Sequence, residues 1–202
     1  MKPLLSALLI VLSFAAYGQD YYSKDSSKAY AKIEESETTS RFYLGMGMGI
    51  NNDAGLVGVT TKIRVYRTFL VNAAAGLGSW GTKLTLGAKY EMKYTRCWGF
   101  GVSYSRCSGF SDYINSFETT TNPSAEVTMD LLPASTLNLT ATYNLYFKRN
   151  KLFYLESGYG IPLNVKPYRI KDGSILTPAS ESLMNFLQPG GIIIGFGFMF
   201  GF

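Results

Sequence analysis

The carboxy-terminal stretch GIIIGFGFMFGF, residues 191–202, decides the fold because bulky and minimal side chains alternate along it. Ile192, Ile194 and four phenylalanines share one parity, whereas the other parity is mostly glycine. Successive side chains of a β-strand point to opposite faces of the sheet. A period of two therefore predicts a strand with one bulky apolar face and one nearly bare face.

Seven further segments alternate in the same way. Their bulky parity, taken up to Tyr104 in the fifth segment, contains no charge, and only Thr61 and Ser157 are polar. The opposite parity is rich in Gly, Thr, Ser and Asn. The eight expected strands are 42–50, 56–66, 69–78, 83–92, 98–107, 137–147, 152–161 and 191–202.

The fold class depends on which face of the expected strands points to the interior of the protein. Small, mostly uncharged side chains make a poor solvent-facing surface, so we expect the bulky parity to face lipid and the small parity to face inward. The expected strands are 9–12 residues long, close to the roughly 9–11 that cross a bilayer at a tilt. A sheet in lipid must close on itself, because lipid cannot satisfy open strand edges. Residues 42–202 are therefore predicted to form an all-β, eight-stranded, antiparallel up-and-down transmembrane β-barrel.

The amino-terminus predicts export. Lys2 precedes an apolar run at 4–16, and Ala16 and Gly18 occupy the −3 and −1 positions of a cleavage site, which is typical of a signal peptide at 1–18. The apolar run would cover only about 20 Å as a helix, too little to span a bilayer. Residues 19–41 are polar and are expected to be a periplasmic leader. Together with the barrel, these features predict the outer membrane of a diderm bacterium.

The composition excludes several functions. The 202 residues contain no His, which rules out His-dependent catalysis and His metal sites. The net charge is +5, but the cations are spread along the chain rather than clustered as for nucleic-acid binding. Glu91 and Glu156 are a candidate acid/base pair, yet neighbouring lysines should keep both ionised. We therefore expect a protein that is not an enzyme, with no cofactor, metal or nucleic-acid partner.

The alternating strands and the terminal Phe202 resemble the small outer-membrane barrels of the OmpX or PorT-like type (the outer membrane protein beta-barrel domain). That resemblance implies that Phe198, Phe200 and Phe202 belong to the signal read by the barrel-assembly machinery. It implies location and architecture but no single activity, because barrels of this kind include adhesins, stability proteins, secretion accessories and a few enzymes. A monomer in contact with outer-membrane lipid is expected.

Six charged residues fall on the inward parity of the expected strands. An eight-stranded barrel is just wide enough for side chains to fill its interior. We therefore expect a packed network of charges rather than a pathway for ions or substrate, with polar dipoles or water offsetting the excess of cations. The six residues are Lys62, Arg64, Lys83, Lys89, Glu91 and Glu156.

Two motifs are interpreted as structural. Cys97 and Cys107 lie ten residues apart on one expected strand, about 33 Å, which is too far for a disulfide. The segment 76–81 matches G-x-G-x-x-G, but it continues into another strand rather than a helix. We expect it to be a hairpin tip, with Trp80 at the outer interface.

The two long connections, 108–136 and 162–190, are expected on the outer side and carry apolar residues. They form a partner surface, or they pack on each other as strands extended above the membrane. Surface binding or envelope stabilisation through these loops is the favoured function. A narrow, porin-like solute conduit and a periplasm-facing accessory of secretion or assembly are the alternatives. The candidate partner residues are Tyr113, Phe117, Leu183 and Phe186.

Overall fold

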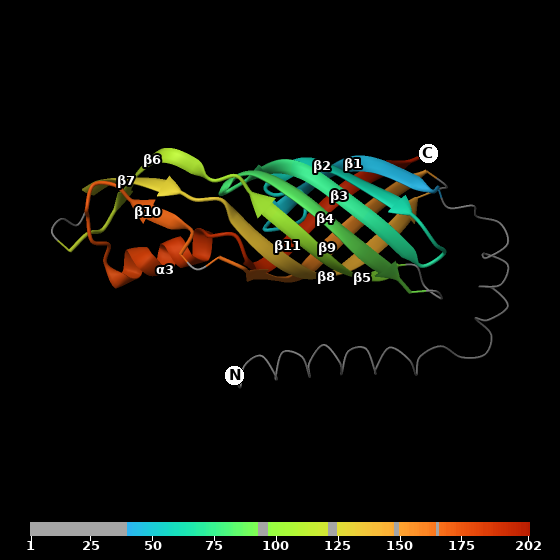
Figure 1. Ribbon diagram of the computed structural model, residues 1–202. Coiled ribbons are helices and arrows are strands. Elements are labelled where there is room, and N and C mark those ends of the chain that lie inside the picture. Colours follow the sequence, from blue (N-terminus) through green and yellow to red (C-terminus); the bar gives the residue numbers. More distant parts are fainter. Residues whose placement is uncertain (1–39, 93–96, 121–124, 148–149, 165) are drawn as a thin grey trace, which may run out of the picture. The chain divides into compact units, whose positions relative to one another are not determined.

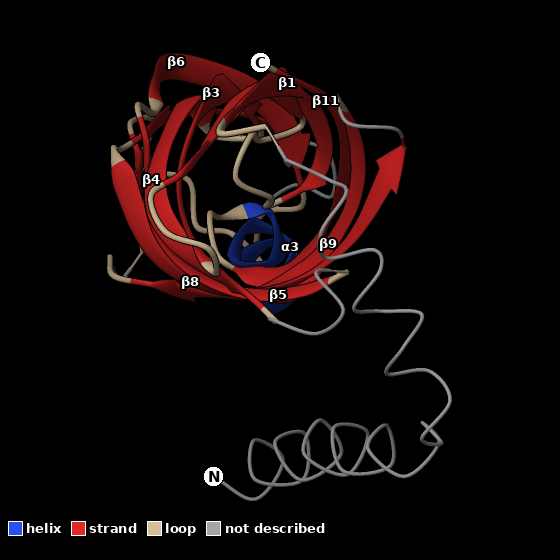
Figure 2. Cartoon of the chain, turned by 90° about the vertical axis from the view of Figure 1, so that its right-hand side faces the viewer, coloured by secondary structure: helices blue, strands red, loops and turns tan. Residues whose placement is uncertain are grey.

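A computed structural model describes residues 40–92, 97–120, 125–147, 150–164 and 166–202. The signal peptide predicted at 1–18 and nearly all of the predicted leader lie outside the described residues. Eight strands close into a barrel in the order β1-β11-β9-β8-β5-β4-β3-β2 (Figures 1 and 2). Their bounds are Phe42–Ile50 (β1), Val57–Arg64 (β2), Phe69–Gly78 (β3), Gly81–Glu91 (β4), Trp98–Cys107 (β5), Ala134–Phe147 (β8), Lys151–Pro162 (β9) and Gly191–Gly201 (β11).

Every neighbouring pair of barrel strands is antiparallel, and the first and last strands close the ring. Met46 of β1 lies opposite Phe198 of β11 on one side and Val59 of β2 on the other. The predicted eight-stranded antiparallel barrel is confirmed. The predicted strand at 137–147 begins three residues earlier, at Ala134, because β8 extends to pair with the full length of β5.

The bulky parity faces outward, as predicted. Leu86 and Ile192, two members of the apolar parity, are 62% and 64% exposed, whereas Asn72 on the opposite parity is 1% exposed. Outward aromatic rings also pair near one end of the barrel, where Trp98 and Tyr143 have ring centroids 5.0 Å apart. A surface that is apolar around a polar interior is the reverse of a water-soluble barrel.

Glycine on the inward parity makes room for large inward side chains. The ring of Tyr154 lies against Gly197 of β11, and its hydroxyl lies against Gly47 of β1. A Cβ at either position would overlap the tyrosine. The alternation of Phe and Gly in β11 thus serves both faces, since the phenylalanines coat the exterior and the glycines admit the residues that fill the interior.

The two long connections form a second structure, which we call the cap. Strands β6 (Phe110–Phe117), β7 (Ala125–Leu131) and β10 (Tyr168–Ile170) make a three-stranded sheet in the order β10-β7-β6. Helix α3 (Pro178–Leu187) lies beside this sheet (Figure 1). The Thr177 side chain accepts a hydrogen bond from the Ser180 backbone N–H at the start of the helix. The sequence left open whether the two long connections form a partner surface or pack on each other as strands. The structure shows that they pack on each other.

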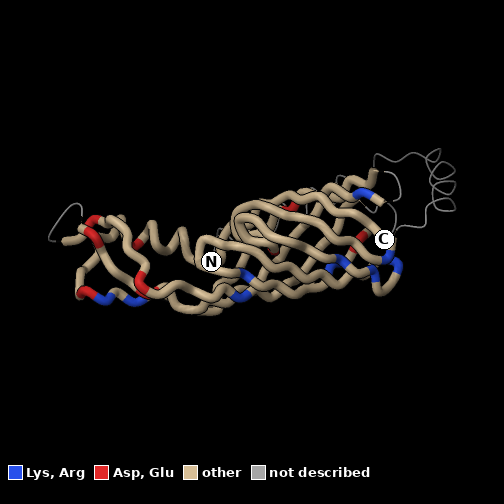
Figure 3. Tube along the Cα trace, turned by 90° about the horizontal axis from the view of Figure 1, so that it is seen from above, with Lys and Arg blue, Asp and Glu red and all other residues tan. Residues whose placement is uncertain are grey.

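The only helix in the described part of the chain is too short to cross a membrane. Charged residues are sparse along the sides of the barrel and are more frequent in the cap and at the opposite end of the barrel (Figure 3).

Candidate functional sites in the lumen and the cap

The structure places all six predicted lumen charges on the inward face of the barrel. Lys89, on β4, lies at their centre and forms ion pairs with two carboxylates from different parts of the chain. Its Nζ is 3.3 Å from Glu156 Oε2 on β9 and 3.1 Å from Asp53 Oδ2. Five of the six residues are buried and Arg64 is half-buried.

Asp53 is a lumen residue that the sequence analysis missed. It belongs to the connection between β1 and β2, and residues 52–55 of this connection are buried inside the barrel. We call residues 52–55 the lumen plug. A short polar connection gives no periodic signal. The predicted lumen charges contain more cations than acids, but this excess was expected to be offset by polar dipoles or water rather than by another carboxylate.

Side chains from three barrel strands hold the lumen plug. Ser103 donates to Asp53 Oδ1 at 2.7 Å, and Asn72 Nδ2 donates to Asp53 Oδ2 at 2.8 Å. Thr85 donates its hydroxyl proton to the Asp53 carbonyl oxygen at 2.8 Å. Lys83 donates to the carbonyl oxygens of Asn51 and Asn52, both at 2.8 Å. Backbone dipoles thus satisfy the charge of Lys83.

A second polar cluster lies toward the opposite end of the lumen. Arg64 forms an ion pair with Glu91 at 2.8 Å, and Tyr146 donates to the other oxygen of Glu91 at 2.7 Å. Asn144 also donates to that oxygen, at 3.1 Å. The ammonium of Lys62 lies 4.2 Å from the centroid of the Tyr154 ring, a cation–π contact. The inward side chains of the described barrel are therefore connected to one another at both of these levels of the lumen.

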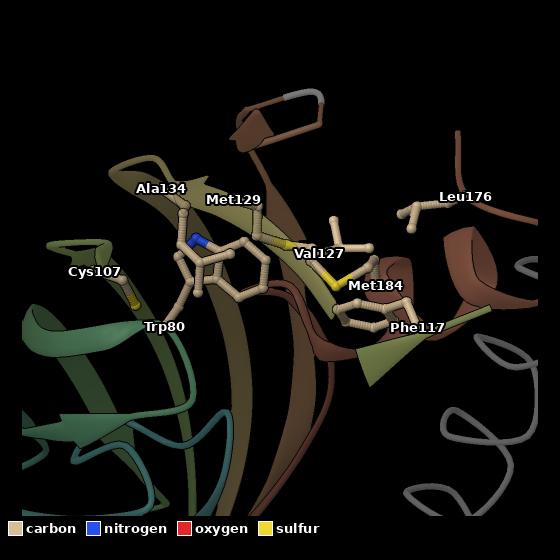
Figure 4. Close-up of a cluster of buried hydrophobic side chains, with 9 residues drawn as sticks. Trp80, Cys107, Phe117, Val127, Met129, Ala134, Leu176 and Met184 are labelled. Atoms are coloured by element: carbon tan, nitrogen blue, oxygen red, sulfur yellow. The ribbon is translucent and has the colours of Figure 1, made fainter. Parts of the chain in front are cut away.

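The cap has an apolar core (Figure 4). Met129 and Val127 of β7, Phe117 of β6 and Met184 of α3 are buried together with Trp80 at the β3–β4 turn. The Trp80 indole N–H donates to the Leu132 carbonyl oxygen at 3.1 Å.

Two sequence-based expectations are therefore wrong. Trp80 is 2% exposed, so it does not lie at an outer lipid interface but packs beneath the cap. Phe117 is 4% exposed and is not available to a partner. Sequence periodicity could not show either result, because the cap core joins segments that are distant in the chain.

The other three candidate partner residues, Tyr113, Leu183 and Phe186, are exposed on the cap. Leu183 and Phe186 lie three residues apart on α3 and share one side of the helix with Leu187. A recess of about 120 Å³ lies beside them and is lined by Tyr113, Leu187 and buried core residues. This apolar surface beside a recess can receive apolar side chains from a partner.

Ion pairs fasten the three strands of the cap sheet to each other. Lys171, directly after β10, lies 2.6 Å from Asp112 Oδ1 on β6 and 2.8 Å from Asp130 Oδ1 on β7. The Asp112 backbone N–H also donates to Asp130 Oδ1 at 3.1 Å. The hydrogen bond from Lys171 is the main reason that the pKa of Asp130 lies below its usual value, and its hydrogen bonds to Asp112 and Asp130 raise the pKa of Lys171.

The structure also places the two cysteines and the three phenylalanines of the expected assembly signal. Cys97 and Cys107 are both free, as expected. Phe198 and Phe200 lie on the outward face of β11 with ring centroids 4.9 Å apart, and the exposed Phe202 packs near Phe42. Within the described residues, no cluster of acidic or Cys side chains is suited to hold a metal ion.

The fold and the distribution of side chains define a class of protein. A closed, eight-stranded antiparallel barrel with an apolar exterior fits the small barrels of the outer-membrane type. No protein-family model and no curated protein matches the chain.

Proposed function

We propose that this chain is a non-enzymatic, monomeric outer-membrane barrel of a diderm bacterium, and that its cap binds a protein partner outside the cell. The apolar band around the barrel supports the membrane location. A water-exposed surface bearing Leu86 on β4 and Ile192 and Phe196 on β11 would carry a large hydrophobic penalty, whereas the same surface is favourable in lipid.

The filled lumen favours binding over conduction. The lumen plug and the residues that hold it occupy the interior at the level of Lys83 and Lys89. Toward the other end, Tyr43, Leu152, Tyr154 and Met199 form a buried cluster. A solute conduit would require these groups to move apart, whereas binding at the cap requires no change in the barrel.

The observation that carries the binding proposal is the apolar stripe of α3. A helix on a water-exposed cap normally turns its apolar face inward. Here Met184 faces the core, yet Leu183, Phe186 and Leu187 remain exposed beside the recess. Apolar and aromatic anchors next to a pocket are typical of the energetic centre of a protein interface.

Site-specific photo-crosslinking in the producing bacterium tests this proposal. We expect a crosslinker at Phe186 or Leu183 to capture one protein species of constant mass, and a crosslinker at lipid-facing Leu86 to capture none. Absence of any product from both cap positions would contradict the binding role. A second measurement tests location, because the mature chain should leave the membrane fraction only with detergent.

A further inference from the structure

The outward surface of the barrel carries a groove of about 420 Å³ over β2 to β5. Its floor contains the small side chains of Thr61, Ala73 and Ala75. Thr61 lies opposite Ala73 across the β2–β3 ladder, and Ala73 and Ala75 lie opposite Leu86 and Leu84 across the β3–β4 ladder. Leu84 and Leu86 of β4 stand higher along one side. The volume lies within the roughly 300–1,000 Å³ of ordinary ligand sites.

One member of the groove lining is charged. Arg106, on β5, is exposed on the outward parity two residues beyond Tyr104. It lies opposite Leu84 of β4 and Ser135 of β8. Among the described residues, no carboxylate forms an ion pair with it. The apolar parity expected for this strand ends at Tyr104, so Arg106 was not among the residues predicted to face outward.

The position of Arg106 near the end of its strand indicates the depth in the bilayer at which its side chain would lie. An outward charge is costly at the middle of a bilayer, and this cost falls steeply toward the headgroup layer. Arg106 precedes the last residue of β5, and the chain then enters the cap at Phe110. The Tyr104 hydroxyl and the Ser135 hydroxyl share a hydrogen bond of 2.8 Å at the same level. These polar groups mark the outer end of the apolar band, where lipid phosphates lie.

We propose that this groove binds one phosphate-bearing lipid of the surrounding leaflet. An acyl chain fills the apolar part between Ala75 and Leu86, and the Arg106 guanidinium binds the phosphate. The proposal rests on the membrane location given above. A guanidinium can donate two parallel hydrogen bonds to a phosphate, which makes it a stronger partner than a neutral group.

Charge and shape together favour this occupant. A recess in a lipid-facing surface leaves its lining without contacts unless a flexible chain enters it. A single unpaired cation at the rim complements one anionic headgroup. A protein segment would instead have to bury backbone polar groups in a mainly apolar groove. The polar residues of its lining are Thr61, Thr85, Tyr104 and Arg106, and the Thr85 hydroxyl already bonds to Asp53 in the lumen.

Native mass spectrometry of the detergent-solubilised, refolded chain tests the headgroup contact. The probes are dimyristoyl phosphatidic acid and dimyristoylglycerol, which share their acyl chains and differ in the phosphate. We expect the chain to retain one phosphatidic acid about tenfold more strongly than the diacylglycerol, and Arg106→Gln to abolish this difference. Arg67→Gln is the matched control, because Arg67 is an exposed cation in the β2–β3 turn at the opposite rim.

A second pair of variants tests the groove itself. Ala75→Leu fills the groove and should weaken retention of both lipids, whereas Ala88→Leu adds the same volume to an outward position of β4 that does not line the groove. The proposal is overturned if Arg106→Gln retains the lipids as Arg67→Gln does, or if Ala75→Leu retains them as Ala88→Leu does. Full displacement of phosphatidic acid by equimolar inorganic phosphate would also overturn it. A chain that is soluble and monomeric without detergent would instead overturn the membrane location, so the two failures are distinguishable.

Discussion

The interior of the barrel is mainly polar, with one apolar cluster, whereas the interior of the cap is mainly apolar. In the barrel the buried positions include Lys89, Glu156 and Asn138, and they are held by hydrogen bonds and ion pairs. In the cap the buried positions include Met129 and Met184, and they are held by apolar contact. Both interiors are closed to solvent, so the difference does not arise from the degree of burial.

The proposed membrane location accounts for this difference. In lipid, apolar side chains gain little by moving inward, so a barrel there keeps most of them outside and fills most of its interior with polar groups that pair with each other. In water, the hydrophobic effect selects the opposite arrangement. Folding of the barrel should therefore depend mainly on the pairing of its buried charges, and folding of the cap on the apolar area that it buries.

The largest effect is expected from breaking the central ion pairs. Lys89→Met leaves the carboxylates of Asp53 and Glu156 buried without their shared cation. Removal of one partner from a buried pair costs about 3–5 kcal/mol, because the remaining charge is uncompensated. Urea unfolding of the barrel in detergent measures this loss. The triple variant Lys89→Met, Asp53→Asn, Glu156→Gln should recover at least half of it. Equal stabilities for the single and triple variants would show that packing, not pairing, controls the lumen.

The next effect tests the apolar core of the cap. Met184→Ala removes buried apolar volume from this core and should cost about 3 kcal/mol of cap stability. The barrel should unfold at the same urea concentration as before, while proteolysis within the cap becomes faster. Leu183→Ala is the matched control on the same helix, since Leu183 is exposed and its loss should change stability by less than about 0.5 kcal/mol. A shift in barrel unfolding with Met184→Ala would show that the two interiors fold as one.

The same contrast explains which features the sequence predicts. A period of two is a local signal, so the strands and their outward face could be inferred from residues such as Phe196 and Leu86 alone. The inward direction of Lys89 and Glu156 followed from the same parity. The closed order of the strands followed from the need to satisfy edges in lipid.

Features without a period could not be inferred in this way. Asp53 reaches the lumen because a short connection bends into the barrel, and nothing in its local sequence distinguishes it from an exposed turn. Trp80 and Phe117 are covered by segments distant in the chain, so their burial depends on tertiary contacts between the two long connections. Arg106 falls on the apolar parity near a strand end, where parity alone does not reveal the membrane boundary.

A smaller effect is expected when the lumen plug loses its charge but keeps its shape. Asp53→Asn retains an oxygen that can accept from Ser103, but it removes the ion pair with Lys89. We expect a loss of about 2 kcal/mol and brief ion currents in planar bilayers that the unmodified barrel does not show. Asp112→Asn, in the cap, should produce no current. Stable currents through the unmodified barrel would instead favour the solute conduit.

The smallest effect concerns the pH dependence of the cap sheet. The pKa of Asp130 is lowered mainly by its hydrogen bond from Lys171, so its contribution to stability is complete above the unfolded-state pKa. This contribution disappears as the pH falls through the lower folded-state pKa. The raised pKa of Lys171 affects the stability of the cap only at alkaline pH. Its contribution to stability is complete below the unfolded-state pKa and disappears as the pH rises through the folded-state pKa, which lies above that of a free lysine. The cap should therefore hold together across neutral pH and loosen in acid.

Emission from Trp80 in a Trp98→Phe background reports on this change, because Trp80 is buried beneath the cap. In the unmodified sheet the emission should shift to the red only below the usual pKa of an aspartate. Asp130→Asn should make the emission less sensitive to acid, whereas Glu126→Gln, which alters an exposed carboxylate on the same strand, should leave the acid transition unchanged. An acid transition that survives Asp130→Asn would assign the pH dependence to a group other than Asp130.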